Sequence, residues 1–284
     1  MTPLRLCWFT TGRGPGSFSL LRSTIEAIES GSLSARIELL FCNRGRGEAE
    51  PTDRLLAYAE SHGIAVEARS SVAFRKGQGG ERSRPGERIP EWRAGFDQSA
   101  MEILDGYEFD LGVLAGYMLI TTPELCRRYP LLNLHPAAPG GPKGAWQDVT
   151  WELIKSGAGE SGILIHVVTP ELDEGPPVAC CRYPIKTPQL AAEWQRLTGA
   201  DVDDLRREEG ESLPLFAAVR RMGLEREAPL LVATLEAAAR RRFVVRPGVA
   251  EAGASGEPLP IDLTRRVEEA LDSAEDLQPG ADHE

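Results

Sequence analysis

Residues 4–30 read LRLCWFTTGRGPGSFSLLRSTIEAIES, and this stretch decides the fold class. Its first seven residues form a short apolar run that predicts a buried parallel strand. A glycine-rich turn follows at residues 11–17, and apolar side chains then recur at helical spacing over residues 19–30. A strand, a tight turn and a helix in this order are typical of the first unit of an α/β domain.

The alternation of strand and helix continues along the chain. Residues 163–168 and 178–183 alternate as a pair of strands that we expect to be antiparallel, at the edge of the sheet. We therefore expect a doubly wound, mostly parallel α/β sheet, with ligands at the carboxyl ends of its strands. The other predicted strands are 37–42, 65–68, 111–115 and 131–134, and the other predicted helices are 52–62, 96–104, 123–129, 147–155, about 201–221 and about 227–242.

Composition excludes several classes of protein. The 284 residues hold 43 Asp and Glu against 32 Lys and Arg, and a net charge of −11 disfavours nucleic-acid binding. No apolar run approaches the roughly 20 residues that a membrane span needs. The five cysteines form no C-x-x-C motif, so we expect no metal site and a cytoplasmic location. The small number of histidines, four, limits the candidates for a catalytic one.

The end of the chain differs in composition from the rest. Residues 247–284 hold ten acidic residues, only two arginines and few large apolar residues. We therefore expect residues 1–245 to form the catalytic domain and residues 246–284 to be an acidic, disordered tail with room for one short helix near 261–272.

Residues 71–93 are rich in glycine, proline and charge, which predicts a flexible insertion. Two interpretations stay open: a solvated surface loop, or a mobile flap that meets an anionic ligand. The basic residues that would serve the flap are Arg75, Lys76, Arg82, Arg84, Arg88 and Arg93.

The turn after the first strand is a candidate phosphate site. Its glycines would let the backbone approach a ligand closely, and the helix that follows would point free N–H groups at an anion. The turn matches neither the dinucleotide-binding fingerprint nor a P-loop, so a purely structural tight turn remains the alternative.

Asn133, His135 and Asp173 form the candidate catalytic group. Asn133 and His135 alternate on a short strand, so their side chains point to one face, and Pro136 then ends the strand. Together with Asp173 they could polarise a carbonyl, stabilise an oxyanion and move a proton. No nucleophile elbow is present, which favours direct transfer over a covalent intermediate. For His166 we favour packing or a supporting role over catalysis.

Three segments carry a resemblance to a known family. Asn133-Leu134-His135-Pro136, Ser161-Gly162-Ile163-Leu164-Ile165-His166 and Glu171-Leu172-Asp173-Glu174-Gly175-Pro176 are similar to motifs of the folate-dependent formyltransferases, over roughly residues 4–240. The resemblance implies a Rossmann-like formyltransferase fold for residues 1–245. It is strongest to the members that formylate glycinamide ribonucleotide.

The resemblance also implies a role for each matching residue. Asn133 would hold the formyl oxygen, His135 would be its charged or proton-donating partner, and Asp173 would orient His135 and take the amine proton through water. 10-Formyltetrahydrofolate, the co-substrate, would be bound by Met118, Leu119, Ile120, Glu171, Leu172, Glu174 and Gly175. The phosphorylated acceptor would be bound by Gly12, Arg13, Gly14, Gly16, Ser17 and Glu209; for Glu209, a solvated helix charge is the alternative.

The implied reaction moves a formyl group from 10-formyltetrahydrofolate to the amine of glycinamide ribonucleotide, without a metal. Four departures from the family pattern put the acceptor in question more than the donor. The phosphate turn is longer than usual, Leu119 stands where an arginine often contacts the folate tail, and residues 71–93 look like an insertion. The fourth is the stretch after His135-Pro136, Ala137-Ala138-Pro139-Gly140-Gly141-Pro142, where the family usually has Ser-Leu-Leu-Pro. The alternatives are another amine such as an amino-sugar nucleotide, hydrolysis of formyltetrahydrofolate, and a non-catalytic folate-binding module.

Overall fold

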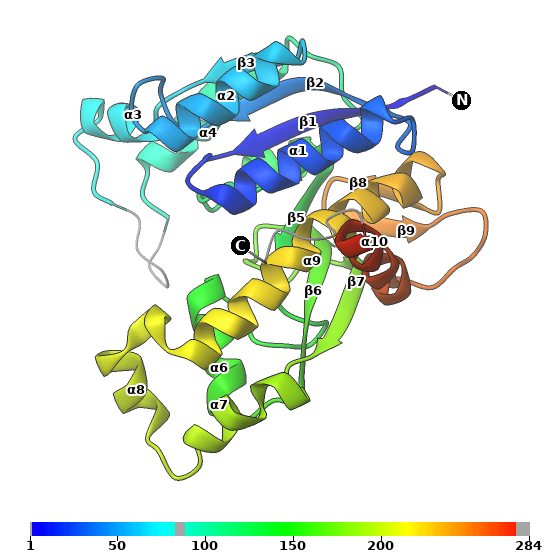
Figure 1. The fold of residues 1–284 in the computed structure, drawn as a ribbon. Helices are drawn as coiled ribbons and strands as arrows, with labels where there is room; N and C mark the ends of the chain where they lie inside the picture. The colour runs from blue at the N-terminus through cyan, green and yellow to red at the C-terminus, as the bar shows by residue number, and fades with distance from the viewer. Residues whose placement is uncertain (1, 83–88, 277–284) are drawn as a thin grey trace, which may run out of the picture.

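A mixed sheet of eight strands forms the centre of the molecule (Figure 1). The computed structural model describes residues 2–82 and 89–276. The strand order is β10-β7-β6-β5-β4-β1-β2-β3, and β8 and β9 form a separate hairpin. The strands are β1 (Leu4–Thr10), β2 (Ala35–Cys42), β3 (Ala65–Ala68), β4 (Leu111–Leu114), β5 (Leu131–His135), β6 (Glu160–Val167), β7 (Pro177–Pro184), β8 (Phe243–Arg246), β9 (Val249–Ala252) and β10 (Ile261–Asp262).

The strand directions confirm the predicted fold class. The β3-β2-β1-β4-β5 half is parallel throughout. β6 is antiparallel to both β5 and β7, as expected for the two alternating strands. The order reverses between β1 and β4, so the loops after these two strands flank the switch point where α/β folds bind ligands.

Alternation along β1 divides the core into two layers. Leu6 and Trp8 face a large cluster formed with α1, α2, α6 and α9, whereas Cys7 and Phe9 face a smaller one formed with α4 and α5. None of the described helices is long and apolar enough to cross a membrane. The helices are α1 (Pro15–Glu29), α2 (Glu50–Ser61), α3 (Ser71–Gly77), α4 (Trp92–Leu104), α5 (Pro123–Arg128), α6 (Trp146–Lys155), α7 (Ala191–Arg196), α8 (Val202–Glu208), α9 (Pro214–Ala239) and α10 (Thr264–Asp276), with short 3₁₀ turns η1 (Pro188–Leu190) and η2 (Gly210–Ser212).

The two long helices predicted at about 201–221 and 227–242 are wrong in their boundaries. A short helix, α8, is followed by a single 26-residue helix, α9, which runs through Pro229. A proline inside a helix removes one N–H donor and disfavours the helical conformation before it. The apolar contacts of α9 with α1, α6 and β6 outweigh that local preference.

The prediction of a disordered tail is wrong for residues 246–276. The boundary at residue 245 falls inside β8, which pairs with β9. β10 then joins the sheet in parallel with β7, and α10 covers α9. Ile261, Leu263 and Val267 are buried. The average composition of residues 246–284 is acidic and gave no sign of these three apolar residues, which pack the segment against the rest of the fold. Residues 277–284 lie outside the described part of the chain.

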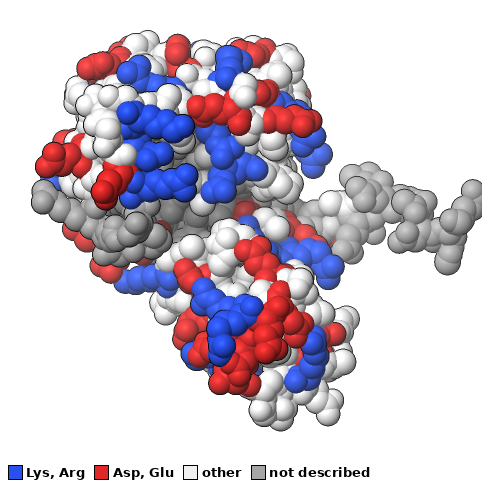
Figure 2. Space-filling model, turned by 90° about the vertical axis from the view of Figure 1, so that its left-hand side faces the viewer, with Lys and Arg blue, Asp and Glu red and all other residues white. Residues whose placement is uncertain are grey.

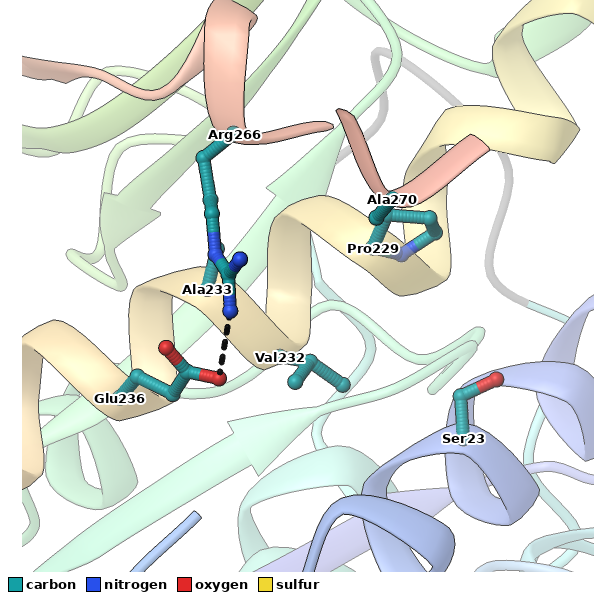
Figure 3. A pocket seen from close by; sticks show the side chains of 7 residues that line it. All are labelled: Ser23, Pro229, Val232, Ala233, Glu236, Arg266 and Ala270. Atoms are coloured by element: carbon teal, nitrogen blue, oxygen red, sulfur yellow. Dashed lines mark hydrogen bonds and ion pairs between the residues drawn. The ribbon is translucent and has the colours of Figure 1, made fainter. Parts of the chain in front are cut away.

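Charges of the same segment also find partners on the body. Both carboxylate oxygens of Glu268 accept from the guanidinium of Arg226, at 2.7 and 2.9 Å. Arg266 reaches Glu236 of α9 at 3.5 Å, and both side chains line a pocket between α1, α9 and α10 (Figure 3). This pocket contains none of the residues predicted to form the functional site. Its lining is Ser23, Pro229, Val232, Ala233, Glu236, Arg266 and Ala270.

The prediction of a flexible insertion at 71–93 is wrong at both of its ends. Residues 71–77 form α3, and Phe74 packs edge-on against Phe96 with ring centroids 5.6 Å apart. At the other end, Arg93 lies in the first turn of α4 and is fully buried. Arg84 and Arg88 fall among residues 83–88, outside the described residues, so the flap interpretation is not tested there.

Candidate active site

The carboxyl end of β5 carries Asn133 and His135. Asn133 is in register with Leu114 of β4 on one side and with His166 of β6 on the other. Because side chains alternate along a strand, Asn133 and His135 project from the same face of the sheet, as predicted. His135 is buried, and its Nε2 lies 2.8 Å from the carbonyl oxygen of Pro142.

Asp173 reaches both of these side chains from the loop between β6 and β7. Its Oδ1 accepts from Asn133 Nδ2 at 3.4 Å, and its Oδ2 lies 3.6 Å from His135 Nδ1. Asp173 has a φ of 55°, a left-handed conformation that turns the loop back over the sheet. Gly175 is required there, because a Cβ at this position would collide with the carbonyl of Val167.

His166 joins the same group. Its Nε2 lies 3.3 Å from Asn133 Nδ2 and 3.7 Å from Asp173 Oδ1. Its Nδ1 lies 2.9 Å from the carbonyl oxygen of Val167, which can only accept, so Nδ1 carries a proton. His166 is thus within reach of both Asn133 and Asp173, which is where the supporting role favoured by the sequence would place it.

Charge at the site is governed by Asp173, whose side chain is only 7% exposed. Burial pushes its pKa upward, but the neighbouring side chains of His166 and His135 and the N–H of Gly144 outweigh that effect, so the pKa of Asp173 is lowered. Asp173 is thus a carboxylate at neutral pH. Both nitrogens of His135 face acceptors, the carbonyl of Pro142 and the carboxylate of Asp173.

The segment predicted to bind the folate follows β4, whose last residue, Leu114, is in register with Asn133. Met118 and Leu172 are two of the few exposed large apolar side chains among the described residues, whereas Leu119 packs against the smaller core cluster. The carbonyl oxygen of Ile120 is held by Arg93. On the loop from β6, Glu174 pairs with Lys143 at 2.7 Å, and Glu171 is exposed.

The glycine-rich turn lies against that segment. The N–H of Thr11 donates to the carbonyl of Gly116 at 3.1 Å, and Thr11 Oγ1 accepts from the N–H of Met118 at 2.8 Å. A Cβ on Gly116 would collide with the Ser17 hydroxyl. The two segments predicted to bind the two substrates are therefore adjacent at the switch point of the sheet.

The turn itself leaves room for a ligand. Gly14 is the N-cap of α1, no side chain caps this helix end, and a Cβ at Gly14 would meet nothing within 4 Å. Gly12 needs its positive φ of 63° and packs against Thr52. Gly16 is different, since a Cβ there would lie 3.4 Å from Leu224 of α9.

Comparison with known proteins identifies the family. The model of the formyl transferase family matches residues 14–197, which include the glycine turn after Arg13, Asn133, His135 and Asp173. The chain belongs to the formyl transferase family. Phosphoribosylglycinamide formyltransferase of Escherichia coli is 27% identical over 172 residues, which cover 60% of this chain and 70% of that protein. The chloroplastic enzyme of that name from Arabidopsis thaliana is 33% identical over 179 residues, 60% of this chain and 52% of that protein.

Solved structures share the fold of this formyltransferase. Phosphoribosylglycinamide formyltransferase from Coxiella burnetii superimposes with a TM-score of 0.60 at 20% identity, over 92% of this chain and 99% of that one. A formyltetrahydrofolate deformylase from Burkholderia mallei gives 0.57 at 17% identity, over 88% and 70%. In the described part of the chain, no group of three or more His, Cys, Asp and Glu side chains is placed to hold a metal ion.

Among the described residues of the formyltransferase, no contact joins Glu209 to the glycine turn. Glu209 lies at the end of α8 and pairs with Arg196 at 2.7 Å. Glu227 of α9 lies at the turn instead, with a carboxylate oxygen 3.9 Å from a Cβ built on Gly16. Burial raises the pKa of Glu227, against the opposing effect of its partner Arg220. In the sequence, Glu227 stands two residues before Pro229. This second acid ahead of a proline was the signal that could have pointed to Glu227.

Basic side chains surround the same turn of the formyltransferase. Arg13 is exposed on it, and Arg44 donates to Thr52 Oγ1 at 3.4 Å, next to Gly12. The guanidinium of Arg54 lies 5.4 Å from the ring centre of Phe18, in the first turn of α1. Figure 2 shows Lys and Arg side chains gathered in the upper part of one face. Positive charge at this helix end suits an anionic ligand.

Proposed function

We propose that this formyltransferase transfers the formyl group of 10-formyltetrahydrofolate to the primary amine of glycinamide ribonucleotide, in purine biosynthesis. The observation that carries the proposal is the convergence of Asn133, His135 and Asp173 within hydrogen-bonding or ion-pair distance at the end of β5. The named relatives, phosphoribosylglycinamide formyltransferases, support the choice of acceptor.

The three side chains divide the reaction between them. As the amine nitrogen bonds to the formyl carbon, the carbonyl oxygen becomes an oxyanion, which Asn133 Nδ2–H and the His135 ring stabilise. Nε2 of His135 donates a hydrogen bond to the formyl oxygen, which takes the place of the carbonyl oxygen of Pro142 as the acceptor. The amine proton passes through water to Asp173.

Collapse of the tetrahedral adduct completes the transfer. The bond from the formyl carbon to N10 of the folate breaks, and N10 takes a proton from His135. Asp173 then returns the amine proton to His135 through water, so the sum is one formyl group moved to the amine and one proton moved from the amine to N10. Asp173 holds the His135 ring in position because its carboxylate lies beside Nδ1.

The two substrates would approach from adjacent segments. The pterin of the donor would lie against residues 118–120 and the loop at 171–175, and the phosphate of the acceptor would lie in the turn at 12–17. The contacts from Thr11 to Gly116 and Met118 support this arrangement, because they hold the two segments side by side. This arrangement would hold the amine of the acceptor close to the formyl carbon of the donor.

A two-arm assay tests the proposal. The protein is incubated with 10-formyltetrahydrofolate, with and without glycinamide ribonucleotide, and tetrahydrofolate is measured. Amine-dependent release supports transfer, and release without the amine would mean hydrolysis. If an amino-sugar nucleotide supports release and glycinamide ribonucleotide does not, the acceptor is misassigned. Binding of the folate without release of tetrahydrofolate would indicate a non-catalytic folate-binding module.

The cytoplasm is the compartment that we propose for this activity. All five cysteines are free and buried, and burial raises the pKa of Cys181 to about 12, which keeps that thiol protonated. Free thiols throughout the chain are typical of a reducing compartment. Fractionation of cells that produce the protein would test the location.

A further inference from the structure

The pocket between α1, α9 and α10 has both charged and apolar walls. Its volume is about 240 Å³, which equals that of roughly eight molecules of liquid water at about 30 Å³ each. Figure 3 shows Arg266 reaching from α10 to Glu236 of α9 beside Val232, with Ser23 of α1 across the open space. The pocket therefore has room for a small organic molecule that is apolar in one part and charged in another.

The carboxylate in this pocket is buried but loosely paired. The side chain of Glu236 is only 8% exposed. Its Oε1 lies 3.5 Å from Nη2 of Arg266, and its Oε2 lies 3.9 Å from Nη2 of Arg240. A charge-assisted hydrogen bond between such groups is normally about 2.7–2.9 Å long. Glu236 can therefore gain a closer cationic partner than either arginine provides, and a buried charge is costly without one.

The attachment of α10 to the body does not depend on this loose pair. Arg226 of α9 holds both carboxylate oxygens of Glu268 at 2.7 and 2.9 Å, and Val267 is fully buried between the same two helices. Arg266 is 55% exposed, and an ion pair with such an exposed partner at this distance contributes little to stability. The charges of Glu236 and Arg266 are thus available to a ligand.

We propose that this pocket binds a small free α-amino acid with an apolar side chain. The ammonium group of the ligand would donate to Glu236, and its carboxylate would accept from Arg266. The apolar side chain would pack against Val232, Ala233 and Ala270. Such a zwitterion gives each of the two charges a closer partner of opposite sign, which the direct pair at 3.5 Å does not. The site lies outside the proposed formyl transfer, and no step of that reaction uses it.

Three matched compounds test the class of ligand on the full-length protein. L-Valine carries both charges, isobutylamine lacks the carboxylate, and 3-methylbutanoate lacks the ammonium group. We expect L-valine to bind with a Kd of about 1 mM or tighter in an isothermal titration, and each of the other two to bind at least roughly tenfold more weakly. The difference measures the contribution of each charged end.

Two variants place the binding in this pocket. Glu236→Gln removes the negative charge and should weaken L-valine at least roughly tenfold. Arg266→Met should reduce the affinity for L-valine to that for isobutylamine, and it decides the matter if Glu236→Gln does not fold, because Arg266 is largely exposed. Glu268→Gln is the matched control, since it loosens α10 without changing the lining of the pocket.

Several results would overturn the inference. These are no saturable binding of L-valine up to about 20 mM, equal affinity for isobutylamine, and an affinity that the folded Glu236 and Arg266 variants leave unchanged. An equal loss in Glu268→Gln would trace the effect to the attachment of α10 instead. Sedimentation is run in parallel, because a dimer that Glu236→Gln dissociates would show that this face joins two copies of the chain, which also contradicts the proposal.

Discussion

Nδ1 of His135 lies 3.6 Å from Oδ2 of Asp173, and the two side chains come from β5 and from the loop after β6. Both side chains are 7% exposed, so this attraction is poorly screened by solvent. The pair joins the residue that would stabilise the oxyanion to the residue that would accept the proton. We therefore expect the two residues to act as a unit in catalysis.

His135→Ala should lower kcat by roughly 10²–10⁴ while the affinity for folate changes little, because the lost interaction forms mainly in the transition state. Asp173→Asn should also lower kcat, and the double variant should be little worse than either single variant. Steady-state kinetics and a folate-binding titration would check this. A near-native kcat for His135→Ala would remove this residue from the mechanism.

Acid stability should depend on Asp173. Its pKa is lowered in the folded protein, so its stabilising contribution is complete above its ordinary value of 3.8 and is lost as the pH falls from there through the folded pKa. Melting temperatures of wild type and Asp173→Asn, measured from pH 7 downward, should therefore converge as the pH falls below 3.8. A difference that stayed constant through this range would contradict the lowered pKa.

Gly14→Val should raise the KM for a phosphorylated acceptor and leave folate binding unchanged. A Cβ at Gly14 would meet nothing within 4 Å, so the added side chain would enter the space that the phosphate needs. Gly159→Val is the matched control, because it too has open space around a Cβ and no positive φ. Gly16→Val is a poorer test, since it would press on Leu224 as well. An unchanged acceptor KM in Gly14→Val would mean that the turn is only structural.

The C-terminal segment should be necessary for stability. Val267→Ala removes fully buried methyl groups between α10 and α9 and should cost about 1–3 kcal/mol. Truncation after residue 246 should destabilise the protein more strongly, because it also removes β10 and the partner of Arg226. Chemical denaturation would measure both. A truncated protein with wild-type stability would show that this segment is dispensable.

The sequence was most informative where local pattern and tertiary structure agree. The alternation of Asn133 and His135 on a strand before Pro136 placed both at a sheet edge, and the structure brings Asp173 to them. It also predicted the antiparallel pair formed by β6 and β7. Periodicity identifies these elements because a half-buried strand needs two different faces.

The features that the sequence concealed depend on long-range contacts. Pro229 lies inside α9 because the helix is held by its neighbours, and Ile261, Leu263 and Val267 fold an otherwise acidic segment. Arg93 looked like one of several solvated bases, although its spacing of four from Asp97 on an apolar helix face was a sign of a buried pair. Composition describes a segment on average, whereas docking depends on a few side chains.

A single-turnover reaction with ¹³C-labelled 10-formyltetrahydrofolate tests the central claim most directly. The protein is mixed with this donor and glycinamide ribonucleotide, and the label is followed by NMR. The account predicts that the label appears as the formamide of the ribonucleotide, and that Asn133→Ala and His135→Ala both slow its appearance. Label that appears as free formate at the same rate with and without the amine would contradict it.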